Sequence, residues 1–352
     1  MGKWKFNQDL LQDAIKTGQR FLLDKNLSKK ERLEITSDIK RFQRFLDGDF
    51  ELIKRKRRLN FEGAKKNILR TMKKHHRMFG KDLKNWFIAL AQSNIFKCDQ
   101  EVPIMILSTD EMVIETLANY RENAPIFYKW AKEILFSPKI NLVQEAIIDS
   151  SSYCFYSDIF HLPFIVIDQL DEAYVLNHEI EHGIEYLMGT PTHQLYSEFG
   201  PLYFEALFND HLYTKHGRQS LSGPLNRIKE TQNFLSILSI YLYTMSVFAH
   251  HNFEVSDELF KETFLDVTNL DENVLLEFLN DEMVESEITE TLGYLLSFLK
   301  AIEIRDYNLR KDETGNYMFN DILFSKKFKF NPPLDGFDPY IRFVEEVKQK
   351  VK

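Results

Sequence analysis

The sequence predicts a mostly helical α+β protein in which a small β-sheet precedes one helix that carries a histidine motif. Three observations predict this class. Apolar residues recur at three- and four-residue spacing through about the first 95 residues, as at Leu10, Leu11 and Ile15. The 352 residues include only 13 Gly and 10 Pro but 44% hydrophobic residues, which favours long helices around a packed core. Short runs rich in aromatic and β-branched residues, typical of strands, lie just before the motif.

The elements can be placed in order along the chain. After the helical N-terminal region, the run VPIMILS at residues 102–108 is short, apolar and bounded by Pro and Asp, which predicts a strand. Helices are expected over residues 110–123 and 125–136. The runs SSYCFYSDIF and LPFIVID, within residues 151–168, predict a pair of strands that lead into the motif helix.

Composition narrows the classes of function. The formal net charge of −8 disfavours a general nucleic-acid-binding protein. Two cysteines, Cys98 and Cys154, are too few for a disulfide framework and indicate a reducing compartment. The first residues contain no apolar core of a secretory signal, so we expect a cytoplasmic protein. The apolar stretch at residues 234–249 is 16 residues long, short of the roughly 18 that a membrane span needs, and predicts a buried helix without membrane contact.

Two segments have opposite charge bias. Residues 54–87 contain 13 Lys or Arg against two acids, and residues 254–290 contain 13 Asp or Glu against Lys261 alone. Each segment can be a solvated helical face. The two can also pair with each other, or flank a cleft and steer a charged ligand. A nucleic-acid-binding patch on the basic segment is a further alternative, but no accompanying motif supports it.

The motif itself is YVLNHEIEHGIEY, residues 174–186. On a helix His178 and His182 project from one face, because residues four apart are neighbours, and their imidazoles can share one metal ion. Glu179 lies about 100° around the helix, where it can act on a metal-bound water without binding the metal. This is the HExxH arrangement of zinc peptidases, with two imidazole ligands and a carboxylate general base.

A catalytic zinc site needs a third protein ligand. Downstream, Gly200 and Pro201 can end one segment and start a helix, with Pro201 in its first turn. Glu205 lies on this expected helix, with enough chain after His182 for the helix to return and face the motif. Glu198, in the loop before it, is the weaker candidate.

Residues 151–210 resemble the thimet oligopeptidase and oligoendopeptidase F family of zinc metallopeptidases. The resemblance lies in four segments in order, YCFYSD, LPFIVID, LNHEIEHG and LYSEFGPLYFEALFND, and covers about 60 of the 352 residues. It implies a helical zinc-peptidase fold in the HExxH-plus-Glu (gluzincin) class. It also implies one Zn²⁺ per chain bound by His178, His182 and Glu205, with Glu179 activating the water. The domains expected are a helical N-terminal region, residues 1–98, and a zinc-peptidase catalytic domain, residues 99–352.

The sequence departs from the family in several places. Relatives carry Gly where this chain has Glu181, a side chain that can crowd the substrate, hydrogen-bond a neighbour or face solvent. Asp210 is a candidate to orient a ligand histidine. Relatives stabilise the oxyanion with Tyr and His from a late helix; residues 289–301 resemble that segment and offer Tyr294, but the tyrosines just upstream are missing. Other candidates for this role are Tyr241, Tyr243, His250 and His251.

The function predicted is a zinc-dependent metallopeptidase that hydrolyses oligopeptides or small polypeptides through a Glu179-activated, zinc-bound water. Its expected partner is a peptide substrate, with neither nucleic acid nor membrane. The alternative is a catalytically weak or inactive metallopeptidase-like protein that serves as an interaction or regulatory module. The missing late tyrosines and the short chain favour this alternative, whereas the intact Glu179 favours the enzyme, since a purely structural site needs no general base.

Overall fold

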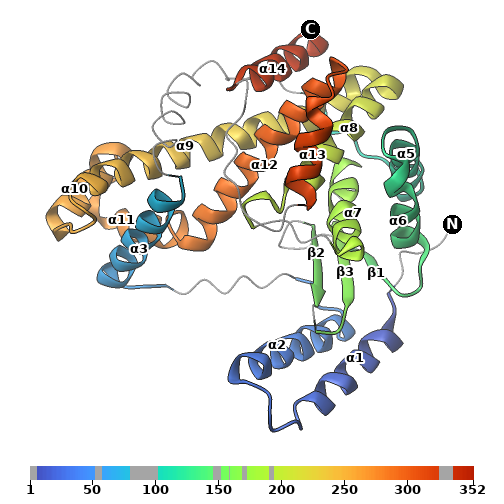
Figure 1. Cartoon of the computed structure of the whole chain (residues 1–352), viewed down its shortest axis with the longest axis horizontal. Helices are drawn as coiled ribbons and strands as arrows, with labels where there is room; N and C mark the ends of the chain where they lie inside the picture. The colour runs from blue at the N-terminus through green and yellow to red at the C-terminus, as the bar shows by residue number, and fades with distance from the viewer. Residues whose placement is uncertain are drawn as a thin grey trace. The chain divides into compact units, whose positions relative to one another are not determined.

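The computed structural model describes residues 6–51, 58–79, 102–145, 152–157, 159–168, 173–189, 194–324 and 336–352. Helices make up most of this part of the chain, and a three-stranded sheet accompanies them (Figure 1). The predicted class, mostly helical with a small sheet before the motif helix, is confirmed.

The sheet has its longest strand in the middle. Strand β3 (Leu162–Asp168) pairs in parallel with β1 (Asn141–Glu145) and antiparallel with β2 (Tyr153–Ser157). Both faces of β3 are covered, so its sequence LPFIVID is apolar at almost every position rather than alternating.

The two faces of β3 have different neighbours because side chains alternate along a strand. Phe164 and Val166 belong to an aromatic-rich core with helices α1 (Gln8–Phe21) and α2 (Lys29–Leu46). The ring of Phe164 stacks on that of Phe45 with 4.1 Å between centroids. Ile165 lies on the other face, against the motif helix.

The N-terminal helices begin where capping residues allow. Asn7 accepts the backbone N–H of Leu10 at the start of α1, and Ser28 forms a capping box with Glu31 at the start of α2. Apolar residues at helical spacing then face the sheet. These observations confirm the helical reading of the N-terminal region over its described residues.

The strand expected at residues 102–108 is wrong. These residues form no ladder, and Ile104 and Ile106 are each 59% exposed. Ser108 instead caps helix α5 with a capping box to Glu111. Short apolar runs do not by themselves specify a strand, because a strand also needs a partner for its backbone. The sequence reading missed β1, which supplies the parallel partner of β3.

The helices around the motif lie close to their expected positions. Helices α5 (Thr109–Asn123) and α6 (Pro125–Phe136) agree with the prediction, and the motif helix α7 (Ala173–Met188) follows the sheet. A short 3-10 helix η2 (Gln194–Tyr196) precedes α8 (Phe199–His216), whose first turn contains Pro201 as expected.

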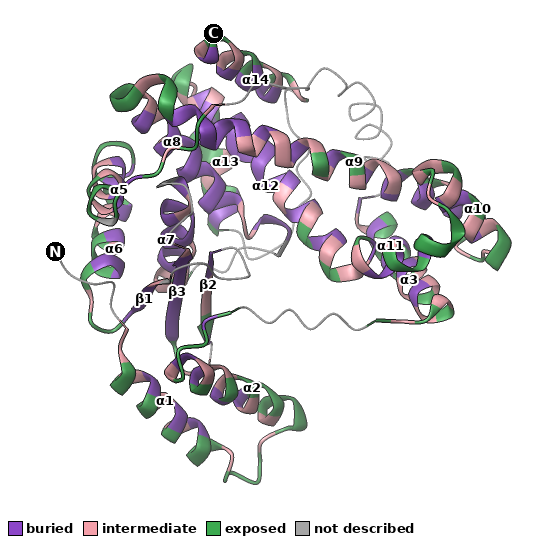
Figure 2. Cartoon of the chain, turned by 180° about the vertical axis from the view of Figure 1, so that it is seen from behind, coloured by how far each residue is buried: buried purple, intermediate pink, exposed green. Residues whose placement is uncertain are grey.

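Long helices form the second half of the chain. Helix α12 is largely buried and packs against η2, α9, α13 and α14 (Figure 2). Within the described residues, no helix is long and apolar enough to cross a membrane. Residues 234–249 lie inside α9, a helix as expected, but only one side of it is buried: Leu238 and Phe248 are buried, whereas Tyr243 is 44% exposed. The helices of this group are α3 (Phe61–Phe79), η3 (Gly217–Leu221), α9 (Ser222–His250), α10 (Asp257–Thr268), α11 (Glu272–Asp281), α12 (Glu285–Leu309), α13 (Thr314–Phe324) and α14 (Asp338–Val351).

The chain divides into two compact units. The first holds the sheet, α1, α2, α5, α6, α7 and the chain from Leu207 to Ser220. The second holds α3, the first half of α8 up to Ala206, and α9 to α14. The boundary expected between residues 98 and 99 lies outside the described residues, so the division into regions 1–98 and 99–352 stays a prediction.

The basic and acidic segments pair with each other where both are described. Lys65 Nζ lies 2.5 Å from Asp257 Oδ1, and Arg70 and Lys74 contact Glu285 at 3.0 and 3.3 Å. Of the alternatives left open by the sequence, these contacts support pairing. Ion pairs at exposed side chains such as Arg70 contribute little to stability, roughly 0–1 kcal/mol, so packing holds these helices together.

A buried histidine in the second unit gives the stability a pH dependence. His75 is 1% exposed and its Nδ1 lies 2.8 Å from the hydroxyl of Tyr241. Burial, helped by the charge of Lys74 and opposed by Glu285, lowers the pKa of His75 from 6.5 to about 4. Between these values the unfolded chain binds the proton and the folded chain does not, so stability is lost as the pH falls from about 6.5 to about 4.

We therefore expect His75→Gln, which keeps an acceptor for Tyr241, to weaken this pH dependence. Relative to wild type, its free energy of unfolding should gain about 1.4 kcal/mol per pH unit below pH 6.5, up to about 3 kcal/mol. Urea titrations at pH 4.5, 5.5 and 7 measure the difference. The exposed neighbour His76, changed to Gln, is the control and should keep the wild-type slope. Equal slopes for wild type and His75→Gln would contradict the assignment.

Candidate metal centre

The motif forms one side of helix α7 as its spacing predicts. The rings of His178 and His182 are 5.1 Å apart between centroids and 77° to each other. His178 is 3% exposed and His182 is half-buried. Two imidazoles one helical turn apart therefore lie side by side, with one of them well shielded from water.

A close approach fixes how near α7 lies to the rest of the first unit. A Cβ added at Gly183 would lie 2.9 Å from Ile134 Cδ1 of α6 and 3.2 Å from Ile165 Cδ1 of β3. Both isoleucines are fully buried, so neither has room to move far. Gly183 thus allows the motif helix to lie against the sheet and α6 at a distance that a larger residue would increase.

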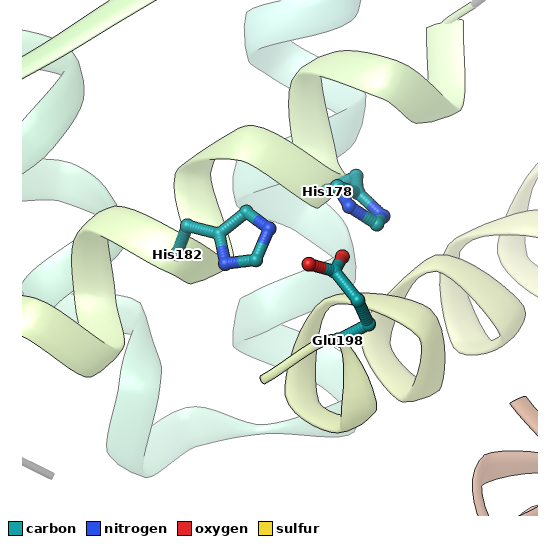
Figure 3. A group of neighbouring side chains, drawn as sticks. All are labelled: His178, His182 and Glu198. Atoms are coloured by element: carbon teal, nitrogen blue, oxygen red, sulfur yellow. The ribbon is translucent and has the colours of Figure 1, made fainter. Parts of the chain in front are cut away.

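The third member of the group comes from the turn before α8. Figure 3 shows the carboxylate of Glu198 directed at the two imidazole rings. One ligand atom from each of His178, His182 and Glu198 lies within 4.8 Å of the other two. Ligand atoms at about 2.0–2.1 Å from a tetrahedral zinc are about 3.3 Å apart, so an approach of at most about 1.5 Å would close the site.

Glu205, which the sequence favoured as the third ligand, has a different contact. Its side chain is 2% exposed, and Arg227 Nε and Nη2 donate to its two carboxylate oxygens at 2.8 Å each. Glu205 is not in the three-residue group that the described residues form. A guanidinium that binds both oxygens of a carboxylate makes that carboxylate a weaker metal ligand. Each oxygen still has a lone pair that can bind a metal ion, so Glu205 as third ligand stays a prediction.

Glu179 follows His178 and is 6% exposed. Its charge acts on Cys154 of β2, where burial, with Glu179 and Glu185 adding to it, raises the pKa of the thiol well above its usual value. The carboxylate is therefore close to the sheet and largely shielded from bulk water. Glu179 is therefore a shielded carboxylate one residue from His178, and its role as general base stays a prediction.

Glu181, the departure from the family pattern, has a neighbour. It is fully buried and accepts a hydrogen bond from the hydroxyl of Tyr120 on α5 at 2.7 Å. Burial raises the pKa of Glu181 to about 8, and the bond from Tyr120 opposes the rise. Of the three roles left open by the sequence, hydrogen bonding to a neighbour is the one observed, with the carboxyl mostly protonated at pH 7.

The late candidates differ in their surroundings. Tyr294 is half-buried, with its ring 5.9 Å from that of Phe234 and 5.9 Å from Arg227 Cζ. The hydroxyl of Tyr241 is occupied by His75 in the core. Tyr243 is 44% exposed. His250 and His251 are exposed at the end of α9. Tyr294 as oxyanion donor, like Asp210 as a partner of a ligand histidine, stays a prediction.

Arg227 is the residue of this region that the sequence reading missed. It lies on α9, 22 residues after Glu205, and contacts Glu205, Glu230 and the ring of Tyr294. A separation of 22 residues across two helices has no periodic signature, so no pattern in the sequence marks this pair.

Comparisons with known proteins find similarity in structure alone. No model of a protein family matches the sequence, and no curated protein matches it. A solved structure of a proposed oligoendopeptidase F has a TM-score of 0.48 at 12% identity, covering 98% of this chain and 74% of that one. A proposed peptidase from Chlamydophila abortus has a TM-score of 0.48, and a proposed oligoendopeptidase F from Bacillus anthracis str. Ames has one of 0.43. Both are 12% identical, and the match covers 98% of this chain but only 61% of theirs. At this identity the likeness assigns no residue.

Proposed function

We propose that the protein is a zinc-dependent peptidase that acts on oligopeptides or small polypeptides. The observation that carries the proposal is the group formed by His178, His182 and Glu198, with ligand atoms within 4.8 Å of one another. Glu179, the residue next to His178, completes the combination of ligands and base that metal-assisted hydrolysis requires.

The chemistry of the donor set fits zinc. Two imidazole nitrogens and one carboxylate oxygen are the ligands that catalytic zinc sites use, with a position left for water or substrate. A set of oxygen ligands would instead favour calcium or magnesium. When bound, zinc supplies a Lewis acid that polarises the scissile carbonyl and increases the acidity of water.

The chain's own residues supply the proton transfers. Glu179 takes a proton from the attacking water and later delivers it to the nitrogen of the leaving amine, so that the carboxylate is restored at the end of each turnover. His178, which is almost fully buried, and His182 keep their imidazoles side by side. The shielded setting of Glu179 strengthens its electrostatic effect on the reacting groups.

Tyr294 is the proposed hydrogen-bond donor to the oxyanion that forms at the carbonyl. Its half-buried ring beside Arg227 keeps the phenol partly accessible. One donor of this kind contributes roughly 10²–10³ in kcat in enzymes that use an oxyanion hole. No tyrosine lies just upstream of Tyr294, where residues 285–289 read ESEIT, and this predicts slow turnover compared with enzymes that have several such donors.

The proposal is tested by metal content and peptide hydrolysis together. Purified wild-type protein should contain about one zinc per chain and cleave members of a quenched peptide library, and a chelator should abolish cleavage until zinc is restored. Protein that binds zinc but cleaves no peptide would support the alternative, an interaction or regulatory module that keeps the metal centre. Protein that binds no zinc would overturn the proposal.

A further inference from the structure

The second unit contains a charged contact on α8, seven residues after the proposed metal ligand Glu198. Arg227 presents a two-pronged hydrogen bond to Glu205, with Nε and Nη2 each 2.8 Å from a carboxylate oxygen. Its third nitrogen, Nη1, lies 2.5 Å from Glu230, three residues further along α9. Glu230, on the same helix as Arg227, also binds the guanidinium and restricts its position. The contact between Arg227 and Glu205 therefore links α8 to α9.

Glu198 and Glu205 belong to one helical segment. The backbone N–H of Leu202 bonds to the carbonyl of Glu198 at 3.0 Å, so the backbone of Glu198 already takes part in the first turn of α8. Seven residues rotate a helix by about 700°, which is only about 20° from two full turns, and advance it by about 10 Å. The two carboxylates therefore start from the same face of α8.

We infer that the Glu205–Arg227 pair is a positioning pair that sets the rotation of α8 and thereby directs Glu198 at the two histidines. This inference rests on the proposed function, since it assigns a role at the same metal centre. The direct ligand is Glu198, and Glu205 acts through the helix.

The geometry shows why such a pair is needed. A side-chain carboxylate lies about 5–6 Å from the helix axis, so a rotation of α8 by 20° would displace it by about 2 Å. Metal–ligand distances tolerate about 0.2 Å. The opposite side of α8 is held by Tyr203, whose hydroxyl accepts from Asn308 and whose ring packs against Phe319. The contacts of Tyr203 set the distance of α8 from α12 and α13. The planar guanidinium of Arg227 adds a directional constraint on the rotation of α8 about its axis.

The test compares zinc affinity in variants of this pair with variants of a similar pair elsewhere. Arg305 and Glu346 form a two-pronged contact at 3.1 Å in the same unit, joining α12 and α14. Arg227→Met, Glu205→Gln and the double variant should each weaken zinc binding by about 10–100-fold, the usual effect of removing a residue that orients a ligand. Arg305→Met and Glu346→Gln should keep wild-type zinc affinity even where they lower the unfolding midpoint.

Two readouts separate positioning from general stability. Competition with a chromophoric chelator gives the zinc dissociation constant, and the visible spectrum of the Co²⁺-substituted protein reports the coordination of the ion. The Arg227 and Glu205 variants should shift this spectrum, while the Arg305 and Glu346 variants should not. Arg227→Lys, which keeps the charge and the fold but loses the fork, should also weaken zinc binding. The double variant should match the single variants, because all three lose the same link.

Each contrary result has a distinct meaning. Arg227→Met and the double variant with wild-type zinc affinity and spectrum would overturn the inference. So would a Glu205→Gln protein that loses zinc as completely as Glu198→Ala, since Glu205 would then be a ligand itself. In both cases, if His178→Ala loses zinc, the proposed function is still supported. Undiminished zinc binding by His178→Ala would overturn the proposed function and the inference with it.

Discussion

Glu179→Gln should retain zinc and fold but lower kcat/KM for peptide hydrolysis by about 10²- to 10⁴-fold. The change keeps the shape of the side chain and removes its ability to take a proton from water, and general bases contribute about this much. The loss corresponds to about 2.7–5.5 kcal/mol of transition-state stabilisation. It is measured as kcat/KM on a quenched peptide, with zinc content determined on the same protein.

Glu181→Gln is the matched control for this experiment. It makes the same substitution two residues along α7, at a buried carboxyl bonded to Tyr120 that is mostly protonated at pH 7. Because Gln resembles the neutral carboxyl, hydrolysis should stay within a few-fold of wild type. Equal activity of wild type and Glu179→Gln on every cleaved peptide would exclude Glu179 as the base.

Glu198→Ala should lose zinc far more completely than Glu205→Ala. Removal of a direct ligand leaves two imidazoles, fewer than a catalytic site uses, whereas removal of the partner of Arg227 leaves all three members of the group in place. The loss at Glu198 should exceed the roughly 10–100-fold expected for a residue that only orients a ligand. Chelator competition on both variants, together with His182→Ala, measures the difference.

The opposite outcome has a clear interpretation. If Glu205→Ala loses zinc and Glu198→Ala keeps it, the third ligand is the one favoured by the sequence, and Arg227 then orients that ligand directly. The effect of Arg227→Met on kcat/KM would also differ, because the substitution would then remove the partner of the metal ligand itself. Retention of zinc by both variants would mean that neither carboxylate is required.

Much of the fold follows from local patterns. The helices α5 and α6 and the strands β2 and β3 lie close to where periodicity, caps and β-branched runs predict them. Residues 102–108 show the limit of this reasoning, because their apolar run resembles a strand but has no ladder, while the polar-ended run of β1 does. Pairing between strands depends on which segments meet, and a single short run contains no information about its partner.

Residue spacing along the chain is enough to predict the part of the site that lies on one helix. His178 and His182 share a face because four residues make about one helical turn, and this holds wherever α7 is placed. Glu198, in the turn just before α8, and Glu205 on α8 are seven residues apart and so point to the same side, and periodicity cannot choose between them. The choice depends on how α8 is rotated and what each carboxylate meets. Two contacts exist only in the folded chain: the one between Arg227 and Glu205 on different helices, and the grouping of Glu198 with the two histidines. Both join residues whose separation in sequence follows no helical repeat.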